Sequence, residues 1–126
     1  MKVLKARHAG ACYGVQRALD MAYAAICDGS TAYTLGPLIH NPQVVSKLEK
    51  RGVGVASSLD EVSDGIVIIR SHGVVPQVKQ DAEAKGLPII DATCPHVARA
   101  QKAASGLADE GYHVIAVGEA GHPEVE

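Results

Sequence analysis

The feature that most constrains the fold is a regular alternation of short apolar runs with longer segments of helical pattern. Each run has about the length of a β-strand, and glycine or proline bounds most of them. Strands that alternate with helices form a parallel sheet with helices packed on its faces. We therefore predict an α/β fold with a mostly parallel sheet, and expect its strands at residues 2–5, 32–35, 53–55, 66–69, 87–90 and 114–117.

The segments between the runs carry start and stop signals of helices. Proline is favoured just inside a helix start because the first N–H groups have no partner there, and glycine is favoured just past the end. Asn41 is expected to cap one helix, and Ser58 with Glu61 to form a capping box around a brief one. The main helices are expected to begin near Gly14, Pro42, Pro76 and Pro95 and to stop before Gly29, Gly52, Gly86 and Gly111.

Composition limits the size and the class of the protein. The chain has 126 residues, enough for one ordinary domain, and 47% of them are hydrophobic, with no Phe and no Trp. The core must therefore consist of Val, Ile, Leu and Ala. A net charge of −2 with scattered basic residues argues against a nucleic-acid surface. There is no window of membrane-spanning length and no signal peptide at the start, so the expected compartment is the cytoplasm.

Histidines and cysteines follow the predicted strands. In an open parallel sheet the turns after the strands share the carboxyl edge, where ligands bind and helix N-termini offer free N–H groups to anions such as phosphate. One histidine in a loop is usually solvated, but several at equivalent positions predict a site. The candidate residues, in chain order, are Cys12, His40, His72, Cys94, His122 and Glu124.

Other residues of the same types lack this placement. Cys27 falls near the end of the first helix, toward the flank of its apolar face, and is expected to be a small packing residue. The carboxylates of Glu119 and Glu126 are expected to be solvated, because neither has the adjacent His-Pro pair of Glu124. The remaining histidines are assigned to surface or framework positions, namely His8, His96 and His113.

Cys12 and Cys94 suggest a metal or cluster site. An odd count of widely spaced cysteines argues against a disulfide framework. Two cysteines and two histidines would complete a zinc site, whereas an iron–sulfur cluster needs mainly thiolates. Cys12 directly precedes a helix, whose N-terminus favours the thiolate. Residue types alone leave zinc and iron–sulfur equally supported.

Glu124 is the candidate acid. If residues 122–124 are extended, the side chains of His122 and Glu124 point the same way and both can face one ligand. Pro123 restricts the backbone between them. A carboxyl group that is partly desolvated beside a bound anion favours its protonated form, which is the form that a general acid needs.

Five ordered motifs resemble those of the hydroxymethylbutenyl diphosphate reductases, the terminal enzymes of the methylerythritol phosphate route to isoprenoids. The motifs are ACYGVQRA, GPLIHNPQVV, SHGV, DATCPHV and GHPEV, and the resemblance covers residues 3–126. The chain departs from the family pattern at Ala11 and Tyr13, where Phe is common, and at Gln16, which is often Lys. These positions flank a cysteine and are not expected to be ligands.

The resemblance implies three similar α/β domains around a 4Fe-4S cluster held by three cysteines. Cys12 and Cys94 match the first two cluster ligands, while the third falls past residue 126. The substrate's diphosphate would meet His40, His72 and His122, and Glu124 would deliver a proton to its hydroxyl. Residues 1–94 would form the first domain, and residues 95–126 the opening helix and strand of a truncated second one.

The implied function is the reductive removal of the allylic hydroxyl of a diphosphate ester, which gives isopentenyl and dimethylallyl diphosphates. Its implied partners are the allylic diphosphate and a ferredoxin or flavodoxin as electron donor. The chain by itself is expected to be a fragment with little or no turnover. Two alternatives remain, a zinc-binding α/β module and a non-enzymatic phosphate-binding domain.

Overall fold

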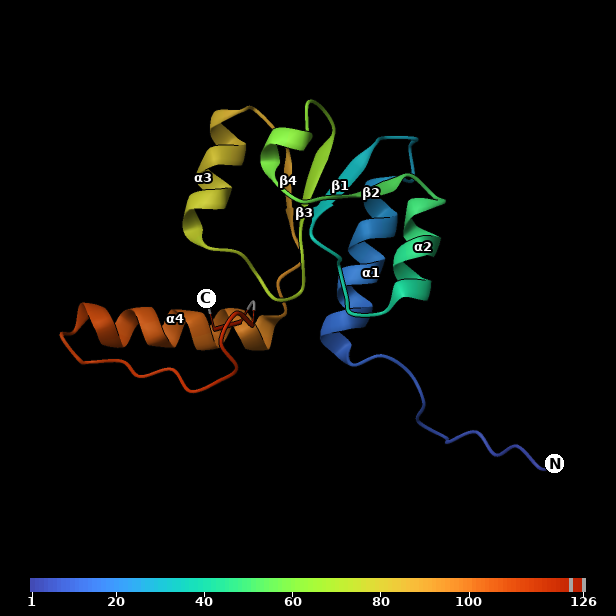
Figure 1. The fold of residues 1–126 in the computed structure, drawn as a ribbon, viewed down its shortest axis with the longest axis horizontal. Helices are drawn as coiled ribbons and strands as arrows, with labels where there is room; N and C mark the ends of the chain where they lie inside the picture. The colour runs from blue at the N-terminus through green and yellow to red at the C-terminus, as the bar shows by residue number, and fades with distance from the viewer. Residues whose placement is uncertain (123, 126) are drawn as a thin grey trace.

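A computed structural model describes residues 1–122, 124 and 125 and has a parallel sheet at its centre (Figure 1). The four strands are β1 (Ala32–Leu35), β2 (Val53–Ala56), β3 (Ile66–Ile69) and β4 (Ile89–Asp91), in the spatial order β2-β1-β3-β4. All neighbouring strands pair in parallel, with Ala32 opposite Val53 on one side and opposite Ile66 on the other. The predicted α/β class with a parallel sheet is confirmed.

Helices cover both faces of the sheet. Helix α1 (Tyr13–Ala25) and helix α2 (Pro42–Glu49) lie on one face, where a core cluster joins residues of α1, α2 and the sheet (Figure 1). The 3-10 helix η1 (Leu59–Glu61) and helix α3 (Pro76–Ala84) lie on the other face, over Val67 and Ile69. The two inner strands are thereby shielded from solvent on both faces.

The caps explain where the helices begin. The side-chain oxygen of Asn41 accepts hydrogen bonds from the backbone N–H groups of Gln43 and Val44 at 3.1 and 3.2 Å, with Pro42 at the first helical position. Ser58 caps η1 through the N–H of Asp60. The Glu61 carboxylate accepts from the N–H of Ser57, one residue earlier than the predicted capping box requires.

Alanine allows α1 to approach the sheet closely. Ala18 and Ala22 lie one turn apart on the face of α1 that meets the sheet, and both are fully buried. Opposite them Ile68 of β3 has no exposed surface, and Leu48 of α2 is buried beside them. The expected core of aliphatic residues and alanine is confirmed.

The strands predicted at residues 2–5 and 114–117 are wrong. Both segments are irregular in the structure, and Val3 and Val117 are 79% and 94% exposed. An apolar run becomes a strand only if its backbone groups find a partner strand, and neither segment pairs with a strand among the described residues. The strand predicted at 87–90 starts later, at Ile89. The N–H of Leu87 instead donates to the carbonyl of Ala82 and closes the end of α3.

Helix α4 (Pro95–Asp109) differs from the other α-helices because none of its residues is buried. It lies beyond the end of β4, away from both faces of the sheet (Figure 1). Among the described residues, no helix combines the length and apolar character needed to cross a membrane.

Two matched substitutions test this division into core and exposed segments. Ile68→Ala should lower the free energy of unfolding by about 2–5 kcal/mol, because it leaves a cavity in the centre of the sheet. Ile115→Ala removes the same atoms from a side chain that is 77% exposed, and should change stability by about 0.5 kcal/mol or less. Urea unfolding of both variants is the measurement. A large loss in Ile115→Ala would show that residues 114–117 are packed in solution.

Candidate functional site at the carboxyl edge of the sheet

The strand order places a topological switch point between β1 and β3. The chain leaves β1 toward β2 on one side and later returns to form β3 on the other, so the connections from these two inner strands diverge. Ligands bind at such switch points in open α/β sheets. His40 follows β1 and His72 follows β3, so both predicted residues lie at the switch point.

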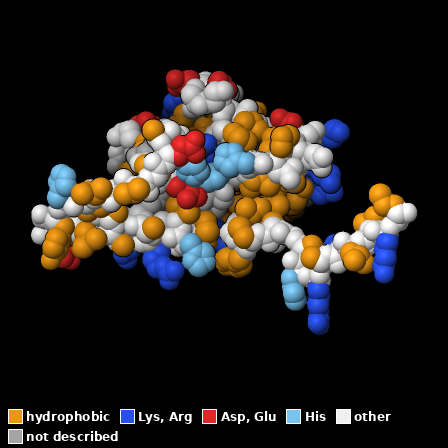
Figure 2. Space-filling view, turned by 60° about the horizontal axis from the view of Figure 1, so that its bottom comes forward, with side chains coloured by type: hydrophobic (Ala, Val, Ile, Leu, Met, Phe, Trp, Pro, Cys, Tyr) orange, Lys and Arg blue, Asp and Glu red, His pale blue; other side chains and the backbone are white. Residues whose placement is uncertain are grey.

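Three histidines meet at this edge. The ring centroids of His40 and His72 are 4.8 Å apart, and those of His72 and His122 are 6.0 Å apart with perpendicular planes. His122 comes from the loop after α4, fifty residues beyond His72 in sequence. Figure 2 shows histidine and acidic side chains gathered near the centre of the face drawn there. The structure therefore brings together the three histidines that the sequence singled out.

His72 is half-buried and has a ring nitrogen without a partner among the described residues. Its Nδ1 atom and the Nε atom of the neighbouring Arg70 are buried without a hydrogen-bond partner among the described residues. Burial lowers the pKa of His72 below its ordinary 6.5, and the charges of His40 and Arg70 add to this, while the carboxylate of Glu124 opposes it. The free site thus favours a neutral His72 and leaves polar atoms available to a ligand.

Glu124 lies close enough to act on the charge of His72. The N–H of Val125 donates to the His122 carbonyl at 2.8 Å, and the N–H of Glu124 donates to His122 Nδ1 at 3.3 Å. The expected parallel orientation of the side chains at 122 and 124 depends on the backbone between them and stays a prediction. The Glu124 side chain is exposed, and Pro123 lies outside the described residues.

The two predicted cysteine ligands occupy equivalent positions at helix starts. Cys12 is the N-cap of α1 and Cys94 is the N-cap of α4, and neither helix start is capped by a side-chain hydrogen bond. Both thiols are free; Cys12 is exposed and Cys94 is half-buried. In contrast, the N–H groups at the start of α2 are already taken by Asn41, so this helix end does not offer them to an anion as the sequence suggested.

Cys27 is not a packing residue. Helix α1 ends at Ala25, so Cys27 lies past the helix and is exposed. It stands at the opposite end of α1 from Cys12, about 20 Å away along the helix axis. The prediction of a packing role is wrong because the helix stops a turn earlier than its apolar pattern suggested.

Ser71 was missed by the sequence analysis although it joins the site loops. Its hydroxyl donates to the Leu38 carbonyl at 3.3 Å, and its own carbonyl accepts the N–H of Cys94 at 2.9 Å. It thereby ties the loops that carry His40, His72 and Cys94. The one sequence signal for a role of Ser71 is its place in the SHGV motif, directly before His72.

The cysteine and histidine side chains of the described residues fit only part of a metal site. In the region that the structure covers, no group of three or more His, Cys, Asp or Glu side chains is arranged to hold a metal ion. The four-ligand zinc site of two cysteines and two histidines is therefore not formed within these residues. Cys12 and Cys94 remain as two free thiols at uncapped helix starts, which fits two ligands of a larger, thiolate-rich site.

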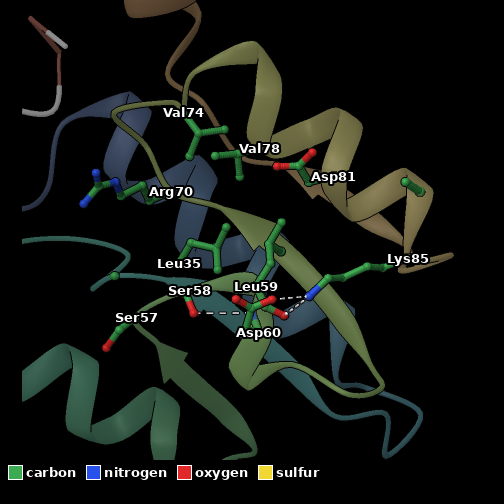
Figure 3. Close-up of a pocket in the computed structure, with 12 residues that line it drawn as sticks. Leu35, Ser57, Ser58, Leu59, Asp60, Arg70, Val74, Val78, Asp81 and Lys85 are labelled. Atoms are coloured by element: carbon green, nitrogen blue, oxygen red, sulfur yellow. Dashed lines mark hydrogen bonds and ion pairs between the residues drawn. The ribbon is translucent and has the colours of Figure 1, made fainter.

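A cavity of about 700 Å³ lies between η1 and α3, and Arg70 is among the residues that line it. Its floor is apolar, with Leu35, Leu59 and Val78, and Asp60 and Lys85 form an ion pair at 2.7 Å at one end (Figure 3). Arg70 lies at the other end. None of the residues predicted for the site lines this cavity, so cavity size does not identify the candidate site.

A family model described as LytB protein matches residues 3–126. This chain belongs to the LytB family. The match covers all five motifs and confirms the resemblance that they carry.

Curated relatives and solved structures extend this finding. The chain is 52% identical over 126 residues to a protein of Trichlorobacter lovleyi and 50% identical to one of Geotalea uraniireducens, both named 4-hydroxy-3-methylbut-2-enyl diphosphate reductase. Each match covers 100% of this LytB chain and 45% of the relative, so the chain spans less than half of the relatives' length.

Two solved structures have the same fold. One is of (E)-4-hydroxy-3-methyl-but-2-enyl diphosphate reductase, described as the terminal enzyme of the non-mevalonate pathway, with a TM-score of 0.83 and 48% identity over 95% of this chain and 43% of that one. The other, a diphosphate reductase from Plasmodium falciparum, has a TM-score of 0.88 and 36% identity over 92% of this chain and 37% of that one.

The lowered pKa of His72 predicts how stability depends on pH. Because the folded pKa lies below the ordinary 6.5, the unfolded chain takes up a proton before the folded chain does as pH falls. His72 therefore leaves stability intact above about pH 6.5 and reduces it as pH falls through and below that value. Urea midpoints of the wild type and His72→Gln, compared between about pH 7.5 and pH 5, should show a steeper loss in the wild type. Parallel pH profiles would contradict this.

Proposed function

We propose that this chain forms the N-terminal part of a 4-hydroxy-3-methylbut-2-enyl diphosphate reductase, an oxidoreductase of isoprenoid biosynthesis by the methylerythritol phosphate route. The observation that carries the proposal is the meeting of His40, His72 and His122 at the switch point of the sheet, in a chain about half identical to reductases of that name. The substrate is an allylic diphosphate. Its hydroxyl leaves as water after the uptake of two electrons and two protons, which gives isopentenyl or dimethylallyl diphosphate.

The histidines are the proposed diphosphate ligands. Asn41 occupies the first N–H groups of α2, so side chains and not this helix end must hold the anion. The unpartnered Nδ1 of His72 supplies a donor when the ring is protonated, and His40 and His122 stand on either side of it. A bound dianion favours the charged form of His72 and offsets the burial that lowers the pKa of its imidazole in the free site.

Glu124 is the proposed proton donor. Its backbone N–H bonds His122 Nδ1, which ties the acid to the diphosphate-binding group, and its side chain reaches the solvent at the same edge. A proton delivered to the leaving hydroxyl turns it into water, a better leaving group.

Cys12 and Cys94 are the proposed ligands of a 4Fe-4S cluster. Both are free thiols at helix starts whose first N–H groups no side chain caps. When bound, such a cluster supplies the electrons for the reduction, received in turn from a ferredoxin or flavodoxin. The third cysteine ligand is assigned to a part of the protein beyond residue 126, since Cys27 stands at the wrong end of α1.

The proposed domain division follows the distribution of buried residues along the chain. Residues 1–94 carry the sheet and its core, and residues 95–126 begin a second α/β domain with α4, which buries no residue in this chain. The proposed compartment is the cytoplasm, where a reducing environment keeps the cysteines as thiols.

A chimera provides the test of function. The matching residues of the Trichlorobacter lovleyi reductase are replaced with this chain, and the hybrid is reconstituted anaerobically with iron and sulfide. Hybrid turnover of the allylic diphosphate is expected, with little or none from this chain by itself. A hybrid that carries a full cluster and binds substrate but has no turnover would exclude the proposed function.

Glu124→Gln tests the proton donor in that chimera. Turnover should fall about a hundredfold or more, with cluster content and substrate binding nearly unchanged, because only proton transfer is lost. Glu119→Gln, the same change at an exposed carboxylate of the same loop, serves as the matched control and should keep turnover. Equal activities of the two variants would remove Glu124 from the mechanism.

His122→Gln tests the anion site in the isolated chain. Inorganic pyrophosphate should bind the variant about tenfold to a hundredfold more weakly than the wild type, as expected for a lost hydrogen bond to a charged group. His113→Gln, at an exposed histidine outside the cluster, should bind like the wild type. Isothermal titration calorimetry gives both affinities. If the His113 variant loses as much, the binding is non-specific.

A further inference from the structure

The first turn of α1 touches the thiol of Cys94. Gly14 is buried there, and a Cβ atom added to it would lie 2.6 Å from Sγ and 3.1 Å from Cβ of Cys94. The distance to Sγ is shorter than real Cβ contacts, and the distance to Cβ is tighter than most of them, so a side chain at position 14 would require Cys94 to shift. The helical Gly106 on α4 is different, because an added Cβ would meet nothing within 4 Å.

A second contact joins the same two segments one turn further along α1. The guanidinium Nη1 of Arg17 donates a hydrogen bond to the carbonyl of Thr93 at 3.2 Å. Gly14 and Arg17 are three residues apart and therefore lie on the same face of the helix. The proposed mechanism assigns no other role to this face of α1.

The segment that receives these contacts is itself held in place. The Asp91 carboxylate accepts hydrogen bonds from both the backbone N–H and the hydroxyl of Thr93, and it also pairs with the Lys79 ammonium at 2.6 Å. Thr93 is buried. The carbonyl that Arg17 binds is thus a fixed point directly before Cys94.

We propose that Gly14 and Arg17 are positioning residues that set the place of the Cys94 thiolate relative to Cys12. Gly14 leaves the space that the sulfur occupies, and Arg17 fixes the backbone from which it projects. Cys12 precedes Gly14 by two residues on the same helical turn, so one rigid element places one thiol and receives the other. The inference deepens the proposed function, because it concerns the two thiols assigned to the cluster.

Cadmium(II) alone, titrated into the isolated chain, is the probe of the two thiols. The absorption of cadmium–thiolate bonds follows binding without any need for the complete enzyme. Wild-type chain should bind cadmium more tightly than Cys94→Ser, and Gly14→Ala should fall to the level of Cys94→Ser, about tenfold or more below the wild type. Gly106→Ala, the matched change at an unobstructed helical glycine, should bind like the wild type. Wild-type affinity in Gly14→Ala would overturn the proposal.

Arg17 gives an independent variant if Gly14→Ala fails to fold. Arg17→Gln should weaken cadmium binding several-fold, and Arg17→Lys should restore part of it, since lysine keeps a donor but not the planar fork. Unchanged affinity in Arg17→Gln would contradict the positioning role of Arg17. A chimera that carries a full cluster and binds substrate but has no turnover, together with these cadmium results, would reject the reductase function and leave the positioning role in place.

Discussion

The site depends on the two hydrogen bonds of Ser71. One ties the end of β3 to the loop after β1, and the other ties it to the backbone of Cys94 after β4. Ser71 is only 7% exposed, so an unmade bond there would leave a desolvated polar group without compensation. Three loops that the parallel sheet brings to one edge are thereby held in one arrangement before any ligand arrives.

That arrangement rests on a core of small side chains. With Ala18 and Ala22 facing the sheet, α1 lies close enough for its first turn to reach the loop after β4. The contact of Gly14 with Cys94 is the result at the ligand-binding edge. A larger aromatic residue at either alanine would move the helix outward and separate the two cysteine loops.

Much of the fold could be predicted from local patterns. The strands at 32–35 and 66–69 and the helix starts at Pro42, Pro76 and Pro95 follow from apolar runs and from proline placement. The runs at 2–5 and 114–117 look the same in sequence, but pairing decides whether a run becomes a strand, and pairing is a property of distant residues. The apolar runs therefore predicted strands correctly only where a neighbouring strand exists to pair with them.

The same distinction holds for the site. His40 and His72 could be placed together because parallel strand ends share an edge. The roles of Ser71, Gly14 and Arg17 depend on contacts across 23 to 80 residues, which no local pattern encodes. The predicted packing role of Cys27 was wrong for the opposite reason. The apolar periodicity of the α1 sequence continues past the residue at which the helix ends.

The position of the core along the chain has a consequence for synthesis. Every buried hydrophobic residue lies between Ala18 and Ala92 among the residues that the structure describes. The strands, the helices on both faces of the sheet and the Ser71–Leu38 hydrogen bond all involve residues that precede α4 in the sequence. These residues leave the ribosome before α4 does. Domains generally fold as units during synthesis, N-terminal first. The nascent chain can therefore form its sheet early, and Cys94 and the loop with His122 join a scaffold that is already folded.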